Sequence, residues 1–102
     1  MRDNLNNFLG AVFGYDQAYL ENCRQEAREG KLKTVEGLPK MDMREASVLV
    51  PDEIATPRFF CTLGDIQFEI PSQGKDAIFE TLPHRAYYRE SEKGKLAALE
   101  IA

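Results

Sequence analysis

The sequence RFFCTLGDIQFEI at residues 58–70 predicts a β-hairpin that turns at Gly64 and Asp65. A two-residue connection that begins with glycine favours a type I′ or II′ turn, because glycine adopts positive φ without steric cost. This turn fixes a register in which Leu63 faces Ile66. Side chains alternate along a strand, so six residues share one face: Phe59, Cys61, Leu63, Ile66, Phe68 and Ile70. We therefore expect an antiparallel sheet with one buried face.

Phe60 is the one large apolar residue on the opposite, wetter face of this hairpin. One interpretation is a ring half-covered by a loop or a helix, because single exposed apolar residues are common on protein surfaces. The other is a contact residue for a protein partner, since aromatic side chains are enriched in interfaces. Phe60 is therefore a candidate partner-binding residue.

The composition of the 102 residues predicts a single domain, residues 1–102, with a core of its own. Hydrophobic residues make up 43% of the chain, but the apolar runs are too short for a membrane span. The first ten residues lack the apolar core of a signal peptide. We therefore expect a cytoplasmic protein that does not enter a membrane.

The net charge of −4 at pH 7 argues against direct binding of DNA or RNA. Such binding usually needs clustered Lys and Arg, because it is driven by neutralising phosphates. Here basic and acidic residues are interleaved, as they are between Glu21 and Lys33. The negative charge is also too thinly spread for a mimic of nucleic acid.

Cysteine and histidine are too scarce for a zinc site, since the chain has only Cys23, Cys61 and His84. No CxxC or HExxH spacing occurs, so we expect no metal and no cofactor. Both cysteines are expected to be reduced core residues, because free cysteine packs as a small hydrophobe. His84 follows Pro83 in a predicted turn and is expected to be exposed.

Residues 3–29 carry the apolar spacing of three and four that is typical of an α-helix. Asp3 is placed to cap its start, and Gly30 follows its end. Gly14 interrupts the pattern, because a glycine inside a helix costs about 1 kcal/mol relative to alanine. Asp16 is placed to cap a second helix. The segment is therefore either one helix bent near Gly14 or two helices separated there.

Besides the hairpin, five segments show the alternation of strands: residues 31–36, 45–50, 75–82, 85–90 and 95–101. The first signal is weak, and the third segment also fits one or two helical turns, although we favour a strand. The last two flank a stretch that ends in Gly94, so they predict a second hairpin. The alanines of the last segment also allow a short C-terminal helix.

Together these elements predict an α+β fold. An N-terminal helix or broken helix pair, residues 1–30, packs on one face of an antiparallel β-meander of about five strands, residues 31–102. A sheet with one apolar face must bury that face, and the amphipathic helical segment is the available cover. Parallel βαβ units are not expected, because no helix separates the later strands.

The predicted strand at residues 85–90 contains the most distinctive polar and aromatic cluster. Alternation places Arg85, Tyr87 and Arg89 on one face, and tyrosine and arginine are over-represented at binding hot spots. One interpretation has one tyrosine of the strand in the core and the other between two solvated arginines. The other interpretation is a surface that recognises an acidic protein or a small anion. On this second interpretation, Arg85, Tyr87 and Arg89 join Phe60 as candidate partner-binding residues.

No catalytic motif occurs, since the chain has no GxSxG, Walker A or GxGxxG pattern, and we assign no catalytic residue. The acidic pairs Asp52-Glu53 and Asp42 with Glu45 are interpreted as solvated loop residues. An alternative function is a small enzyme or small-molecule-binding protein with a pocket between helix and sheet. Four side chains would converge there: Tyr15, Tyr19, Cys61 and His84.

The function expected from these observations is a non-enzymatic protein-interaction domain. Such a protein acts as an inhibitor, adaptor or assembly factor by occupying the surface of a partner. A homodimer is compatible with either function, because an unpaired edge strand offers a pairing surface. A concave pocket with a titratable group of perturbed pKa would favour the enzyme, and an exposed aromatic patch would favour the interaction domain.

Overall fold

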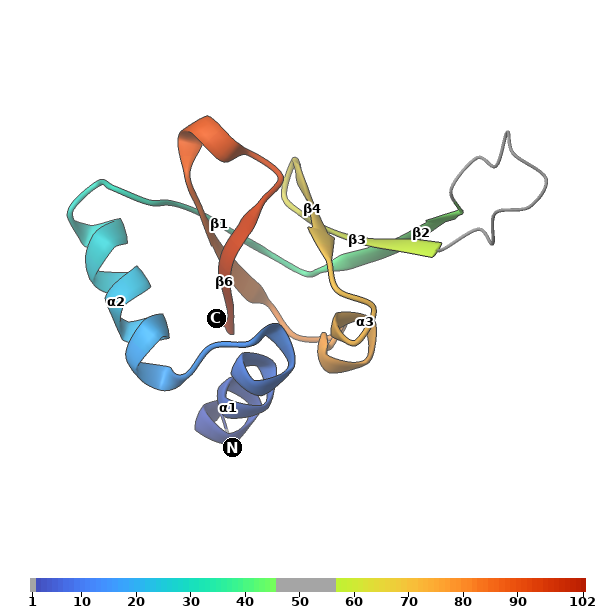
Figure 1. Ribbon diagram of the computed structural model, residues 1–102, viewed down its shortest axis with the longest axis horizontal. Helices are drawn as coiled ribbons and strands as arrows, with labels where there is room; N and C mark the ends of the chain where they lie inside the picture. Colours follow the sequence, from blue (N-terminus) through green and yellow to red (C-terminus); the bar gives the residue numbers. More distant parts are fainter. Residues whose placement is uncertain (1, 46–56) are drawn as a thin grey trace.

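The computed structural model describes residues 2–45 and 57–102, which form the α+β fold expected from the sequence (Figure 1). Its N-terminal helices pack against antiparallel strands. Apart from Glu45, the predicted strand at residues 45–50 lies outside the described residues. The acidic pair Asp52-Glu53 lies outside them altogether.

The N-terminal segment forms two helices, α1 (Arg2–Phe13) and α2 (Gln17–Arg28), so the alternative with a break is confirmed. The chain turns at Gly14, whose φ of 88° is one that glycine adopts without strain. Asp16 then caps α2, because its carboxylate accepts a hydrogen bond of 2.9 Å from the backbone N–H of Tyr19.

The predicted hairpin is confirmed in every pair of its register, from Leu63 opposite Ile66 to Phe59 opposite Ile70. It consists of β3 (Pro57–Leu63) and β4 (Ile66–Ile70). Gly64 has a φ of 60°, as a turn that begins with glycine requires. Cys61 is only 2% exposed and Phe68 1%, so this face of the hairpin is buried as expected from Cys61 to Phe68, whereas Phe59 is half-buried.

The remaining strands depart from the single meander that we expected. Within residues 2–45 and 57–102, six strands form two three-stranded sheets, with the orders β1-β5-β6 and β2-β3-β4. The four strands outside the hairpin are β1 (Lys33–Gly37), β2 (Lys40–Glu45), β5 (His84–Tyr88) and β6 (Leu96–Ile101). Leu38 and Pro39 separate β1 from β2, and proline has no N–H to continue a ladder. The chain therefore leaves one sheet and enters the other at this point.

The two sheets together make a partly open barrel. On one side the chain passes directly from β1 of the first sheet to β2 of the second. On the other side Glu69 of β4 forms a parallel β-bridge with Lys95, and its backbone nitrogen lies 3.3 Å from the carbonyl oxygen of Gly94. The order around the barrel is therefore β1 with β2, β3, β4, β6, β5 and back to β1. The short helix α3 (Gly74–Ala77) comes between β4 and β5. If β1 and β2 are counted as one bent strand, this order resembles that of a five-stranded OB-type barrel.

Several of our local predictions were wrong. Asp3, which we placed as a helix cap, lies inside α1, and Asp42 and Glu45, which we placed in a loop, belong to β2. Residues 75–82, for which we favoured a strand, contain the last three residues of α3 followed by a turn. Here Gly74 packs closely on α1, since a Cβ atom on it would come within 2.9 Å of the Phe13 ring. His84, which we expected to be exposed, begins β5 opposite Ile101 and is fully buried. The strand starts one residue earlier than predicted, which takes this side chain out of the turn.

The second predicted hairpin is confirmed, and its last strand β6 is a strand rather than a helix. Its connection contains a short 3-10 helix, η1 (Glu90–Glu92). Strand β6 lies at the edge of its sheet, and side chains of the helical segment bind its free backbone groups. The Tyr15 hydroxyl accepts a hydrogen bond of 2.9 Å from the Leu99 N–H and donates one to the Leu99 carbonyl, and Asn6 Oδ1 accepts one of 2.8 Å from Ile101. The helices thus protect an edge that would otherwise pair with another chain.

Candidate functional site

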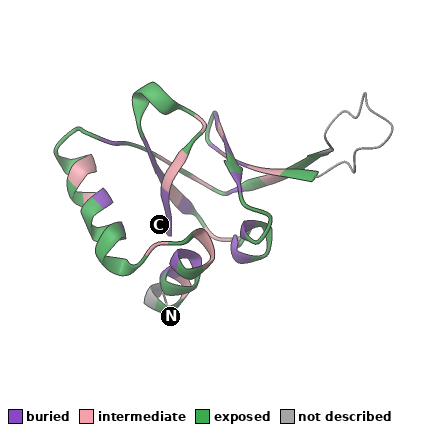
Figure 2. Ribbon diagram, viewed as in Figure 1, coloured by how far each residue is buried: buried purple, intermediate pink, exposed green. Residues whose placement is uncertain are grey.

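Strands β2 and β3 extend past the barrel as a projecting hairpin, which we call the arm and define as residues 40–45 and 57–60 (Figure 1). Burial decreases along β3 towards its start, since Cys61 is buried, Phe59 and Phe60 are half-buried, and Arg58 is exposed. Figure 2 shows the same change in colour towards the outer end of both strands. Side chains on both faces of the arm are therefore accessible in part.

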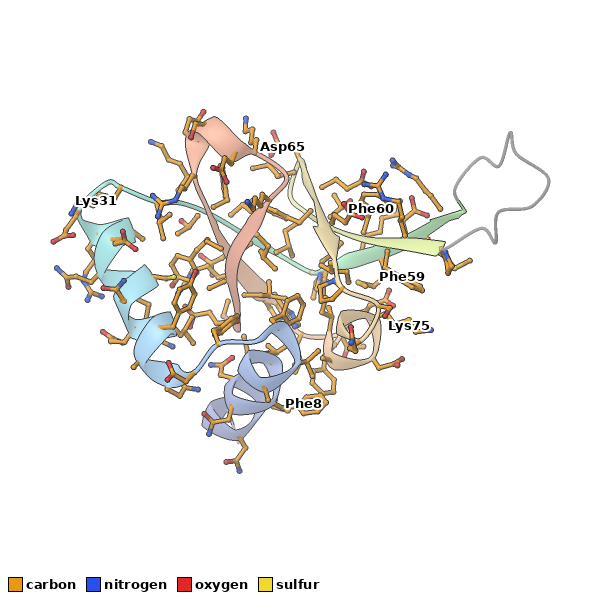
Figure 3. All side chains as sticks on the ribbon, viewed as in Figure 1. Phe8, Lys31, Phe59, Phe60, Asp65 and Lys75 are labelled. Atoms are coloured by element: carbon orange, nitrogen blue, oxygen red, sulfur yellow. The ribbon has the colours of Figure 1, made fainter. Side chains whose placement is uncertain are left out.

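The inner face of the arm forms a groove with α3 and the residues after it. We call this pocket of about 270 Å³ the arm groove; its lining residues are Met41, Asp42, Met43, Phe59, Lys75, Asp76 and Glu80. Met43 is 53% exposed. Phe59 points towards Lys75, whose Nζ lies 5.0 Å from the centre of the ring (Figure 3). The apolar face of the hairpin thus continues beyond the core into an open groove.

The charge of the arm groove is negative. Asp76 and Glu80 are acidic, and Lys75 is the single basic residue among the lining residues. Asp42 also lines the groove, but its carboxylate lies on the outer face beside Arg44. The apolar floor and the acidic rim together suit an apolar side chain that is flanked by lysine or arginine.

The outer face of the arm holds Phe60 between two arginines. The guanidinium carbons of Arg44 and Arg58 lie 4.7 and 5.4 Å from the centre of its ring, which is the geometry of a cation–π contact. Figure 3 shows Phe60 on the side of the arm opposite to Phe59. The ring is half-covered, as one interpretation of the sequence predicted, but by these arginines rather than by a loop or a helix.

Acidic and amide groups already bind both of these arginines. Arg58 makes two hydrogen bonds of 2.8 and 2.7 Å to Glu69, and Arg44 makes one of 2.9 Å to Gln67. Arg44 also lies 3.6 Å from Asp42. The outer face therefore carries as much negative as positive charge beside Phe60.

The other predicted binding residues come together only in part. Arg85 and Tyr87 share a face of β5, but Tyr87 is 2% exposed and packs in a cluster with Leu20 and Cys23 of α2. Arg89 follows the end of β5, after a register shift at Tyr87 and Tyr88, and it lines a separate hollow beside Tyr19. The shift and the end of the strand break the alternation on which the prediction relied.

Glu100 is a buried charged residue that our sequence analysis did not single out. It is fully buried on β6 and accepts hydrogen bonds from Arg24 at 2.8 and 3.3 Å and from the Tyr87 hydroxyl. Burial by itself raises the pKa of this carboxyl, but these hydrogen bonds and the charges of Arg24 and Arg85 outweigh it, so the pKa is lowered. A sequence signal was present, since a glutamate within the apolar run of β6 requires a buried partner.

The four side chains proposed for a pocket between helix and sheet do not line one pocket. Tyr15 and Tyr19 line a surface hollow of about 460 Å³, and neither Cys61 nor His84 lines it. Burial and the nearby Glu80 raise the pKa of the Cys61 thiol to about 12, so this thiol stays protonated and unreactive at neutral pH. Burial lowers the pKa of His84, so its ring is neutral there too.

Within the described ranges 2–45 and 57–102, no group of three or more His, Cys, Asp or Glu side chains is placed to hold a metal ion. No helix in the same part of the chain is long and apolar enough to cross a membrane. No protein-family model matches the chain, and no curated protein or solved structure matches it. The arm groove must therefore be interpreted from its own chemistry.

Proposed function

We propose that this chain is a non-enzymatic protein-interaction domain, an inhibitor, adaptor or assembly factor, which binds its partner in the arm groove. The observation that carries the proposal is the row of Met41, Met43 and Phe59, whose apolar surface continues beyond the core. Methionine suits such a surface, because its flexible side chain adapts to the shape of a bound group. A cytoplasmic location agrees with this function and remains part of the proposal.

The partner would present an apolar side chain flanked by basic residues, which matches the acidic rim of the arm groove. This differs from the acidic partner expected for the Arg85–Tyr87 face. Tyr87 is buried, and Arg85 lies 3.1 Å from Glu36, so that face offers an acidic protein little free surface.

Direct binding of nucleic acid is not part of the proposal. OB-type barrels often bind oligonucleotides on the face formed by their second and third strands, which are β3 and β4 here. On that face Phe60 is covered by Arg44 and Arg58, and these arginines are already paired with acidic and amide groups. Two arginines are also far fewer than the basic cluster that a phosphate backbone usually needs.

A second copy of the chain is another partner that the arm suits. Within the described residues β2 pairs on one side only, and the N–H of Met43 binds its neighbour Asp42 at 2.9 Å. If two β2 strands paired antiparallel with Met43 opposite Met43, each Asp42 would face Arg44 of the second copy. A register with Met41 opposite Met43 would instead place Asp42 opposite Asp42, so the charges favour the first register.

Affinity capture with the full chain and two matched variants tests the arm groove. Met43→Lys places a positive charge in the groove and should abolish capture of a partner with basic flanks. Leu38→Lys is the control, because Leu38 is also an exposed apolar residue, 60% exposed, but does not line the groove. Thermal melts of both variants verify folding.

The proposal predicts a protein that the wild type and Leu38→Lys retain and that Met43→Lys loses. Binding of the purified partner to the three chains should repeat this order. An identical set of captured proteins with all three chains would refute it. Light scattering tests the dimer separately, since Asp42→Arg should place like charges opposite each other and dissociate it.

A further inference from the structure

Another pocket lies between α2 and strands β1 and β5, beside the buried cluster that contains Leu20, Cys23 and Tyr87, and three arginines line it. We call this space of about 300 Å³ the arginine pocket; its lining residues are Arg24, Ala27, Arg28, Thr34, Arg85 and Tyr87. None of the lining residues is acidic. The arm groove shares no residue with it, so an inference about this pocket does not depend on the proposed function.

The carboxylate of buried Glu100 orients the guanidinium groups of Arg24 and Arg85. It accepts hydrogen bonds from Nε and Nη2 of Arg24, and its Oε2 lies 3.7 Å from Nη1 of Arg85. Its side chain is only 1% exposed, so its carboxylate positions the guanidinium groups without occupying the pocket. A site held in place by a buried partner in this way needs little rearrangement when a ligand binds.

The other acidic partners of the arginines lie at the surface and are replaceable. Glu21 is 59% exposed and pairs with Arg24 at 2.9 Å and with Arg28 at 3.5 Å. Glu36 is 52% exposed and pairs with Arg85 at 3.1 Å. Exposed ion pairs contribute little, because water and side-chain freedom compete with them. An anion with several oxygens can therefore take over these contacts.

The spare donors of the pocket suit a tetrahedral anion. Each guanidinium carries five N–H donors. Arg28 uses only Nη2, which binds Glu21 and Gln25, and Arg85 uses only its two terminal nitrogens, so donors remain on both. Thr34 lines the same pocket. The partial negative charge at the C-terminal end of α2 opposes an anion, but the full charges of Arg24 and Arg28 outweigh it.

We propose that the arginine pocket binds the phosphate group of a phosphate monoester. A phosphate can accept hydrogen bonds from three guanidinium groups at once, whereas a carboxylate has only two oxygens to share among them. The space beside the arginines leaves room for the organic part of the ester. The Arg85–Tyr87 face thus serves a small anion, with Arg24 and Arg28 in place of Arg89.

Titration of the isotope-labelled full chain, followed by NMR, tests this site. The probes are phenyl phosphate, inorganic phosphate and acetate, and the expected result is saturable shifts of the Thr34, Arg85 and Tyr87 amides with both phosphates but not with acetate. Tighter binding of phenyl phosphate would identify an ester as the ligand, and equal binding would identify free phosphate. The first outcome supports the proposal, and the second overturns its ester part.

Two variants locate the binding. Arg28→Gln removes an arginine whose side chain is 60% exposed, so the fold should remain intact, and loss of its charge-assisted bond should weaken phenyl phosphate binding about tenfold or more. Arg89→Gln removes an exposed arginine outside the pocket and should leave the affinity unchanged. Equal effects of the two variants, or an absence of saturable shifts up to millimolar concentration, would overturn the proposal.

Discussion

The substitution Tyr15→Phe removes one hydroxyl from the junction of the helices with β6 and keeps the aromatic ring. This hydroxyl accepts a hydrogen bond from the Leu99 N–H and donates one to the Leu99 carbonyl. Leu99 is 1% exposed, and within the described residues no strand is hydrogen-bonded to Leu99 on that side, because the contact with β4 is at Lys95. Burial raises the pKa of Tyr15 to about 12, so the hydroxyl keeps its proton, and with it both roles, at neutral pH. The substitution therefore deprives two backbone groups of their partner at once.

The expected cost follows from these two groups. Leaving one buried donor or acceptor unsatisfied costs about 1–3 kcal/mol. Tyr15 is only partly buried, so water can enter beside the phenylalanine ring and relieve part of the loss. We expect a decrease of about 2–3 kcal/mol in the free energy of unfolding, which corresponds to a fall of roughly 10–20 °C in Tm for a domain of this size.

Urea unfolding followed by circular dichroism measures this decrease, with Tyr19→Phe as the matched control. The Tyr19 hydroxyl donates to the Ala97 carbonyl of the same strand at 3.0 Å, but Tyr19 is 43% exposed, so water can replace it. The control should lose less than about 1 kcal/mol. Equal losses in the two variants would show that the helices do not protect the edge of β6 in this way.

Three further predictions concern pH, the buried carboxylate and nucleic acid. Burial lowers the pKa of His84 below its ordinary 6.5, so as the pH falls His84 takes up a proton in the unfolded chain before it does in the folded protein. The stability of the fold should therefore decrease as the pH drops below 6.5. The substitution His84→Asn should flatten this part of a curve of urea midpoint against pH. Glu100→Ala leaves Arg24 and Tyr87 without their buried partner and should cost about 3–5 kcal/mol in thermal or urea unfolding, and an unchanged midpoint would contradict the described network. Fluorescence anisotropy should detect no binding of labelled single-stranded DNA at physiological salt, and salt-dependent binding that Phe60→Ala weakens would show the outer face to be a nucleic-acid site.

The hairpin at residues 58–70 could be predicted in full, because a two-residue turn fixes the register and alternation fixes the faces. The break at Gly14 was predictable as one of two alternatives for the same kind of reason, since glycine and Asp16 act within a few residues. These features depend on neighbours in the sequence.

The candidate sites were less predictable, because they depend on residues far apart in the chain. Strand β2 was not predicted, because its methionines alternate with charged residues, a composition that is also typical of a loop. Of the arginine pocket, the sequence indicated only Arg85 and Tyr87. The contact between Arg24 and Glu100 joins residues 76 positions apart in the chain, which sequence patterns do not predict. The alternation that grouped Arg89 with them failed where β5 ends.

The sequence by itself determined the hairpin at residues 58–70, which local geometry controls. It predicted the N-terminal helical segment and the second hairpin, each with an alternative that only the structure decided. The tertiary structure alone decided that the strands divide between two sheets and that the hairpin at residues 58–70 serves both as a wall of the barrel and as part of the arm. The same apolar face is buried at Cys61 and open at Met43 and Phe59. The physical reason is that alternation specifies which side chains share a face, whereas burial depends on what the rest of the chain places against that face.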